Sequence, residues 1–245
     1  MPKPIKKRKR KKHITEEEVY SFLETCRDYY ENNKRFVHLL VVAMLSLVVI
    51  VVFTTYYFKD RAKKAYALEY EGYKYYHKLY DASALSDDEA LNKALEKFQL
   101  AYKKKPEAIS LYYIALVQLK KGQDDKALKS LETLVKKFPR NKELTALSLY
   151  EIAQIQIRKG NRESALRNLE KMYALSSPYF KDLALYESAR LLESMNKTEE
   201  ALKKYSLIVE RYPSSPYFSI ARSKIEEKKK KEDKKESSNK KKKTK

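Results

Sequence analysis

Adjacent acidic residues are the first candidates for chemistry in this chain of 245 residues. Paired carboxylates catalyse proton transfer only where burial or neighbouring charges adjust their pKa values. Each pair here lies in a polar segment, where solvation alone accounts for it, and no nucleophile can be assigned a general base with an orienting partner. We therefore expect a protein that is not an enzyme. The pairs are Asp87-Asp88, Glu199-Glu200 and Glu226-Glu227.

Residues that bind metals or phosphate groups are scarce. Cys26 is the only cysteine, which excludes an internal disulfide and any multi-cysteine zinc or iron–sulfur centre. The three glycines are too scattered to build a phosphate-binding loop. We expect no metal ion and no cofactor. The three histidines, His13, His38 and His77, lie in different segments.

Positive charge is concentrated at the two ends of the chain. The sequence has 54 Lys+Arg against 33 Asp+Glu, a formal net charge of +21. Roughly +16 of this charge falls in residues 1–13 and 228–245, and we expect both segments to be disordered because like charges repel and bury no core. The Lys-rich C-terminal tail admits three interpretations: contact with an anionic membrane, contact with nucleic acid, or a solubilising terminus. The middle of the chain is only mildly basic, so nucleic acid is not favoured as a partner.

Residues 36–58 form a long uncharged segment, FVHLLVVAMLSLVVIVVFTTYYF. About 23 residues at ~1.5 Å each reach about 34 Å, which suffices to cross the hydrocarbon core of a bilayer. The segment is apolar on every side, unlike the core helix of a soluble domain. Bulky residues at its end replace the small-residue cleavage site of a signal peptide. We predict an uncleaved, single-pass transmembrane helix.

The flanking charges predict how this helix is oriented. The basic cluster at residues 3–12, with Arg27, Lys34 and Arg35, favours a cytoplasmic N-terminus. Four basic residues within 59–64 weaken the contrast without reversing it. We predict a location in the inner (plasma) membrane, with the rest of the chain outside the cytoplasm.

Residues 14–35 show helical spacing of apolar residues next to the predicted anchor. We expect a short amphipathic helix on the cytoplasmic side of the membrane. It is either a membrane-surface anchor or a docking helix for a membrane partner, and both interpretations stay open. The apolar positions are Val19, Phe22, Leu23, Cys26 and Tyr30.

The rest of the chain repeats the spacing A-x3-F-x2-A-x4-P four times, with conservative replacements. A small residue admits a neighbouring helix, a bulky residue one turn later fills the gap between helices, and proline ends the helix. The four sets are Ala94, Phe98, Ala101, Pro106; Ala127, Leu131, Leu134, Pro139; Ala165, Leu169, Met172, with Pro178 one residue late; and Ala201, Tyr205, Ile208, Pro213.

A second helical pattern precedes the last three of these sets. Each ends at a residue that tolerates the left-handed conformation of a tight turn: Gly122, Gly160 or Asn196. We therefore predict pairs of antiparallel helices. The positions expected to face the partner helix are Leu111, Ile114, Ala115; Leu149, Ile152, Ala153; and Leu185, Ala189, Leu192.

These patterns resemble the tetratricopeptide repeat family. The resemblance implies an all-α protein in which an α-solenoid of about four units, over residues 60–213, follows the transmembrane helix and presents a concave face. The sequence departs from the family in lacking tryptophan and in placing Gln118 and Gln156 where an aromatic residue is common. Residues 214–227 are expected to cap the stack with Tyr217, Ile220, Ala221 and Ile225 facing inward.

In this family the fifth position of the first helix usually points into the concave groove. That position holds Tyr112, Tyr150 and Tyr186 here, and the ninth position holds Leu116, Gln154 and Arg190. Tyrosine offers a rigid ring and one polar tip, which suits a peptide groove of loose specificity. The rings either bind a peptide or pack on the adjacent helix.

The order of segments also resembles the YfgM family of ancillary SecYEG translocon subunits. The residues that carry this resemblance are EEEVYSFLETCRDYYENNKR, the adjacent anchor and KDRAKKAYALEYEGYKYY. The resemblance implies a periplasmic chaperone-like module that binds exported polypeptides and contacts translocon subunits and a membrane chaperone such as PpiD. An envelope-assembly or cell-division scaffold, echoed in RYPSSPYFSIARSKI of the CpoB-like and BamD-like groups, is the alternative. A reversed topology would instead give a scaffold facing the cytoplasm.

Overall fold

The computed structural model describes residues 16–175 and 180–243, and its contacts divide the chain into two units, Met1–Asp60 and Arg61–Lys245. Within the described ranges every regular element is a helix and no strand occurs, which confirms the predicted all-α class. The basic segment 1–13 and Pro178 lie outside the described residues.

The first unit contains α1 (Glu16–Asn32) and the beginning of α2 (Lys34–Tyr76). The apolar part of α2 has a mean hydropathy of 3.0 and none of it is buried, so α2 is long and apolar enough to cross a membrane. Its few hydroxyl groups need no water: Ser46 donates to the carbonyl oxygen of Val42 at 2.8 Å, and Thr54 donates to that of Ile50 at 2.8 Å. Internal pairing of this kind is what a hydrocarbon environment demands.

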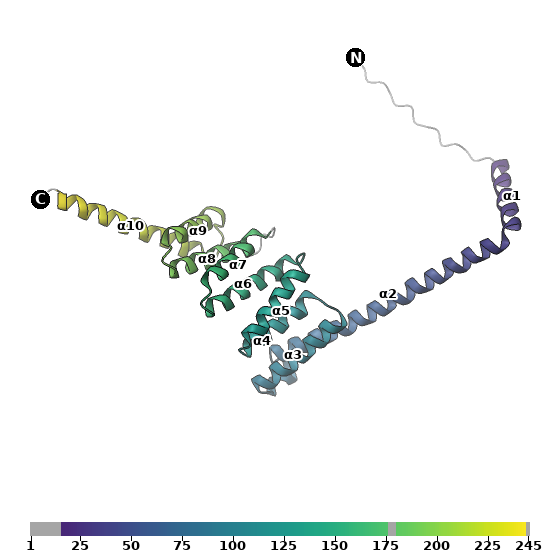
Figure 1. Cartoon of the computed structure of the whole chain (residues 1–245), viewed down its shortest axis with the longest axis horizontal. Helices are drawn as coiled ribbons and strands as arrows, with labels where there is room; N and C mark the ends of the chain where they lie inside the picture. The colour runs from purple at the N-terminus through teal and green to yellow at the C-terminus, as the bar shows by residue number, and fades with distance from the viewer. Residues whose placement is uncertain (1–15, 176–179, 244–245) are drawn as a thin grey trace, which may run out of the picture. The chain divides into compact units, whose positions relative to one another are not determined.

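The second unit is a series of antiparallel helix pairs (Figure 1). The final turns of α2 lie against α3, where Glu71 forms an ion pair with Lys97 and Gly72 faces the ring of Phe98. Each later helix pair packs on the one before it. The last helix, α10, packs on α9 at the end of the series. After α2 the elements are the 3-10 helix η1 (Tyr80–Ala84), α3 (Asp87–Lys104), α4 (Ala108–Lys120), α5 (Asp124–Lys137), α6 (Lys142–Arg158), α7 (Arg162–Ala174), α8 (Lys181–Ser194), α9 (Thr198–Arg211) and α10 (Phe218–Lys243).

The predicted core positions are confirmed. Every residue of the four second-helix sets, apart from the prolines, is almost fully buried, as are all nine first-helix positions. Ala94 and Phe98 illustrate the principle: the small side chain lets a neighbouring helix approach, and the ring one turn later fills the space beside it.

The turns between paired helices have the predicted backbone. Gly122, Gly160 and Asn196 have φ values of 68°, 80° and 59°. No atom lies within 4 Å of a Cβ placed on either glycine, so backbone conformation rather than space requires glycine at these turns.

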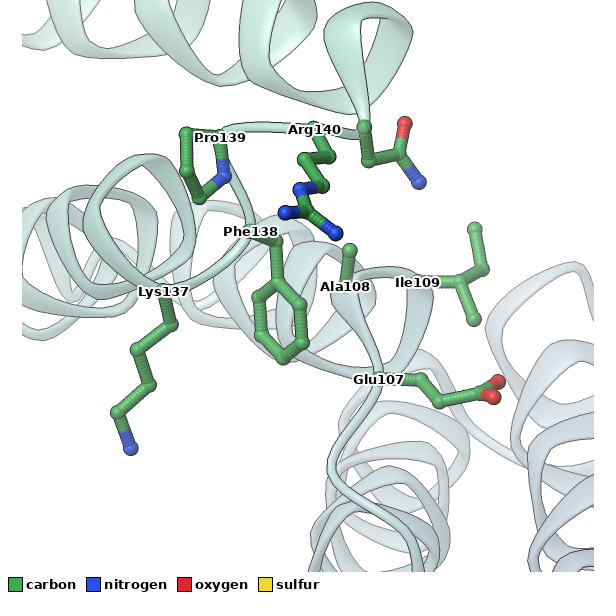
Figure 2. A pocket seen from close by; sticks show the side chains of 8 residues that line it. Glu107, Ala108, Ile109, Lys137, Phe138, Pro139 and Arg140 are labelled. Atoms are coloured by element: carbon green, nitrogen blue, oxygen red, sulfur yellow. The ribbon is translucent and has the colours of Figure 1, made fainter.

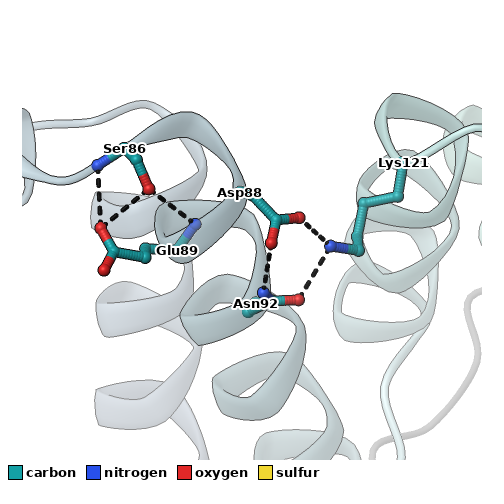
Figure 3. A network of polar contacts seen from close by, with 5 residues as sticks. All are labelled: Ser86, Asp88, Glu89, Asn92 and Lys121. Carbon is teal, nitrogen blue, oxygen red and sulfur yellow. Dashed lines mark hydrogen bonds and ion pairs between the residues drawn. The ribbon is translucent and has the colours of Figure 1, made fainter.

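Ion pairs link the turns at Gly122 and Gly160 to the preceding unit, and Figure 3 shows the first of these links. Lys121, which follows α4, binds Asp88 at the start of α3 and donates to Asn92 Oδ1 at 2.8 Å. The start of α3 is itself fixed by a capping box between Ser86 and Glu89. An equivalent ion pair recurs one unit later, where the guanidinium of Arg158 donates two hydrogen bonds of 2.9 and 3.1 Å to the carboxylate of Asp124.

The C-terminal helix differs from the sequence prediction in two respects. Ile220, predicted to face inward, is 44% exposed, because Tyr217 and Ala221 already define the stripe that packs on α9. Residues 228–245 were predicted to be disordered, whereas α10 continues to Lys243. Lysine and glutamate are strong helix formers, and no glycine or proline follows Pro216, so local propensity outweighs charge repulsion in this segment.

Candidate protein-binding surface

The three fifth-position tyrosines lie on successive first helices of the repeats. Tyr112 is on α4, Tyr150 on α6 and Tyr186 on α8, and all three are half-buried. Each ring packs partly against the hydrophobic core of its own region and keeps the remainder of its surface accessible. The three rings are therefore partly packed in the fold and partly accessible to a ligand.

Two further tyrosines extend this series at its ends. Tyr76, at the end of α2, lies near enough to Tyr112 to contribute to the raised pKa of Tyr112. At the other end, Tyr217 stacks on Tyr186, with ring centroids 4.3 Å apart and an interplanar angle of 13°. We call these five residues the tyrosine row: Tyr76, Tyr112, Tyr150, Tyr186 and Tyr217.

Sequence reasoning missed both end members. Tyr76 lies four residues after Gly72, the residue that faces Phe98, so it is not at the fifth position of its helix and the family's positional convention does not single it out. Tyr217 precedes α10 and was predicted only as a capping residue.

Two carboxylates accompany the tyrosine row, and sequence reasoning missed them as well. Glu151 and Glu187 each follow a row tyrosine directly, on α6 and α8. Burial raises the pKa of Glu151, and the positive charge of Arg158 opposes this rise. No hydrogen bond or ion pair to Glu151 occurs among the residues that the structure describes. Glu187 is also enclosed, since 12% of its side chain is exposed.

The carboxylates and the row tyrosines form one electrostatic neighbourhood. Burial raises the pKa of Tyr112, and the negative charge of Glu151 raises it further. Burial also raises the pKa of Tyr150, with contributions from both Glu187 and Glu151. The phenols therefore stay protonated at neutral pH and can each donate a hydrogen bond.

The three ninth-position residues differ in their exposure and in their contacts with the tyrosine row. Leu116 and Gln154 are half-buried, whereas Arg190 is exposed. Arg190 lies 3.3 Å from a carboxylate oxygen of Glu187, and its guanidinium is 5.7 Å from the ring centre of Tyr186. Arg190 thus contacts both a row tyrosine and the carboxylate that follows it, whereas no such polar contact is found for Leu116 or Gln154 among the residues that the structure describes.

A hollow outside the row lies where the start of α4 meets the loop between α5 and α6 (Figure 2). It has a volume of about 670 Å³ and includes Glu107, Phe138 and Arg140 in its walls. Glu107 is already engaged by Lys105, and Phe138 packs on the core. Glu107 and Phe138 are thus held by contacts within the fold, and the hollow lies where two consecutive repeats join.

The apolar side of α1 is a second exposed surface. Val19, Phe22 and Leu23 are all exposed, and Tyr30 forms a 3.0 Å hydrogen bond with His38. The helix carries six acidic residues against Arg27 alone, so it is strongly negative as well as amphipathic.

The paired carboxylates have structural roles. Asp88 is bound by Lys121, Glu199 by Lys228, and Glu226 by Arg222 at 2.9 Å. In the part of the chain that the structure describes, no group of three His, Cys, Asp or Glu residues is arranged to hold a metal ion.

Comparisons with known proteins agree with this architecture. The sequence matches a family described as tetratricopeptide repeat-like domain over residues 27–226. No curated protein matches the sequence. The solved structure of MamA protein is 17% identical with a TM-score of 0.50, and the match covers 66% of this chain and 79% of MamA. A tetratricopeptide repeat protein from Parabacteroides merdae is 18% identical with a TM-score of 0.53, covering 70% of this chain and 62% of that one. At these identities the likeness is one of fold.

Proposed function

The chain belongs to the tetratricopeptide repeat-like domain family, and we propose that it is a membrane-anchored scaffold that binds other polypeptides. The observation that carries this proposal is the continuity of α2, whose unburied apolar part runs without a break into the first repeat. The family match supports the same view, because it begins at residue 27 and so includes the apolar segment together with the repeats.

The proposed arrangement has a single membrane-spanning helix at residues 36–58 and the repeats outside the cytoplasm. The support for this orientation is the cluster of basic residues before the apolar segment. A solenoid tethered at one end suits a scaffold, since it holds partners near the membrane and leaves the helices of the stack accessible.

The finer proposal is an ancillary role at the protein-export translocon, in which the repeats bind newly exported polypeptides and function as a periplasmic chaperone. It is supported by the order of segments: an acidic amphipathic helix, an anchor, and repeats that start within the anchor helix itself. In this arrangement α1 lies on the cytoplasmic side. Its negative charge favours a basic protein partner over an anionic lipid surface.

Topology is tested by reporter fusions at residue 245. Alkaline phosphatase, which folds only after export, should be active there, and a reporter that works only in the cytoplasm should be silent. The opposite pattern would reject the proposed orientation.

Partnership is tested by photo-crosslinking from exposed positions on α1 and within residues 36–58 in living bacteria, followed by mass spectrometry. We expect translocon subunits and a membrane chaperone among the adducts. Their consistent absence would reject the translocon role and leave an anchored scaffold with other partners.

A further inference from the structure

We propose that the tyrosine row binds extended polypeptide segments in which lysine or arginine side chains alternate with apolar ones. The proposal rests on the proposed function, because it names the class of polypeptide that the scaffold prefers. It is carried by Glu151 and Glu187, which lie beside the row at equivalent positions of consecutive repeats.

Glu151 is the first cation site. A half-buried carboxylate without a hydrogen-bond or ion-pair partner loses hydration, and the positive charge of Arg158 offsets this loss only in part, since the pKa of Glu151 is still raised. An ammonium or guanidinium group from a bound segment would provide the missing partner. The ionised form of Glu151 is therefore more favourable with a cationic ligand than without one.

Glu187 is the second cation site, one repeat further along. Its side chain is 12% exposed, and it forms an ion pair at 3.3 Å with Arg190, whose own side chain is 57% exposed. Distances of 3.3 and 3.4 Å from one guanidinium nitrogen to both carboxylate oxygens describe a weak pair. A ligand cation can replace Arg190 there at little cost, because the displaced arginine moves into water.

The rings of the row accept cations within the protein itself. The Lys120 ammonium lies 3.9 Å from the ring centre of Tyr76, and the Arg190 guanidinium lies over Tyr186. These internal contacts show that two members of the row already present their faces to positive charge. The apolar parts of the same rings suit the residues between the cations of a bound segment.

Local negative charge is notable because the chain as a whole carries +21. At physiological ionic strength, exposed charges more than about 8 Å away are largely screened, so a ligand at the row responds mainly to the charged groups beside it. These are the half-buried carboxylates of Glu151 and Glu187 and the cations of exposed side chains, whose charges water screens more strongly: Lys120, Arg158 and Arg190. An acidic segment would meet Glu151 and Glu187 at short range. The row therefore discriminates against acidic segments as well as favouring basic ones.

The test uses the full chain in a neutral detergent and three fluorescein-labelled peptides of 13 residues, a length chosen to be about that of an extended strand crossing several repeats. The peptides alternate valine or tyrosine with lysine, glutamine or glutamate, and fluorescence anisotropy gives Kd. We expect the lysine peptide to bind at least about tenfold more tightly than the glutamine peptide, and the glutamate peptide to bind most weakly.

Variants test whether the preference for the lysine peptide depends on Glu151 and Glu187. Glu151→Gln with Glu187→Gln should reduce the lysine-over-glutamine preference to about twofold or less, while Glu96→Gln should retain it. Glu96 is the matched control, because it is an exposed glutamate in the middle of α3. Circular dichroism at 222 nm checks that all variants remain folded, and neither row carboxylate substitution removes packing volume.

The outcomes separate this inference from the proposed function. Equal binding of the lysine and glutamine peptides, or a preference that survives in the double variant, overturns the cation preference and leaves the scaffold function standing. A preference for the glutamate peptide also overturns it. Failure of all three peptides to bind overturns both the inference and the assignment of polypeptide binding to the row.

Discussion

Gly72 lies directly against the ring of Phe98. A Cβ atom on Gly72 would be 3.0 Å from three carbons of that ring, and Phe98 is itself stacked on Tyr113 with centroids 4.8 Å apart. The absence of a side chain on α2 thus lets the helix that leaves the apolar segment pack closely on the second helix of the first repeat. This contact joins the first repeat to its neighbour through Tyr113 of α4.

Gly72→Ala is expected to lower the free energy of unfolding of the repeats by about 1 kcal/mol. Alanine improves helix propensity by about 1 kcal/mol at such a position, but crowding in a packed core costs about 1–3 kcal/mol. Chemical denaturation followed by circular dichroism measures the net result.

A double-mutant cycle with Phe98→Leu identifies the cause. The smaller side chain leaves room for the new methyl group, so Gly72→Ala should stabilise the Phe98→Leu protein although it destabilises the parent. Equal effects of Gly72→Ala in both backgrounds would show that the Phe98 ring is not the reason why alanine is unfavourable at position 72.

Glu151→Gln is expected to stabilise the protein at pH 7 and to have no stabilising effect near pH 4. Burial raises the pKa of Glu151 in the folded state. The folded state therefore favours the protonated carboxyl. The stability that the protonated Glu151 contributes is complete below the pKa of the unfolded state and is lost as the pH rises through the pKa of the folded state. Arg158, Tyr76, Tyr112 and Tyr150 are the titratable groups around it.

At pH 7, Glu151→Gln should raise the free energy of unfolding by at most about 1 kcal/mol, since the carboxylate of Glu151 is still partly accessible to solvent, which screens its charge. Thermal melts at pH 4 and pH 7 provide the measurement. Destabilisation at pH 7 would mean that Glu151 has a favourable partner within the fold, which would also weaken its assignment as a ligand site.

Tyr150→Ala should lower both peptide affinity and the free energy of unfolding, the latter by about 2 kcal/mol, because the ring is half-buried against the core. Tyr150→Leu should cost less than about 1.5 kcal/mol of stability, since it keeps the apolar contact, yet it removes the ring face and the hydroxyl. Affinity for the lysine peptide should therefore fall in both variants.

The pair of variants distinguishes packing from binding. Normal affinity in Tyr150→Leu would mean that the ring serves only the fold. A loss of affinity in the leucine variant at nearly native stability is the signature of a ring that contacts the ligand.

Asp124→Asn should lower the free energy of unfolding by less than about 1 kcal/mol, because the ion pair with Arg158 is largely open to solvent. Hydrogen bonding to Arg158 lowers the pKa of Asp124. The contribution of this carboxylate is therefore present above the unfolded pKa and is lost as pH falls through the folded pKa. Denaturation at pH 7 and pH 3 tests it, and a larger difference between the two proteins at pH 3 would contradict this sign.

The repeat core was predictable because its packing follows a fixed sequence spacing. Ala94 and Phe98, four residues apart, sit one turn apart on any helix, and the same offset recurs in each unit. The left-handed turns were predictable for a similar local reason, since Gly122 and Gly160 are the residues for which a positive φ costs least.

The candidate surface was predictable only in part. Tyr112, Tyr150 and Tyr186 were predicted through the family's positional convention, but Glu151 looks in sequence like any solvated glutamate. Its burial is a property of the folded stack, which no local sequence pattern reports. The prediction that Ile220 faces inward was wrong for a related reason. Helical spacing places Ile220 at the edge of the buried stripe, and packing against α9 decides whether a residue at that edge is buried or exposed.

The most direct test of the account places a photo-crosslinking amino acid at Gln154, which is half-buried on α6 beside Tyr150, in the full chain expressed in living bacteria. The same substitution at Glu96 on α3 serves as the control. During pulse labelling, the account predicts adducts between residue 154 and newly exported polypeptides, with few from residue 96. Equal adducts from both positions, or none with exported chains from residue 154, would contradict a scaffold that binds polypeptides along the tyrosine row.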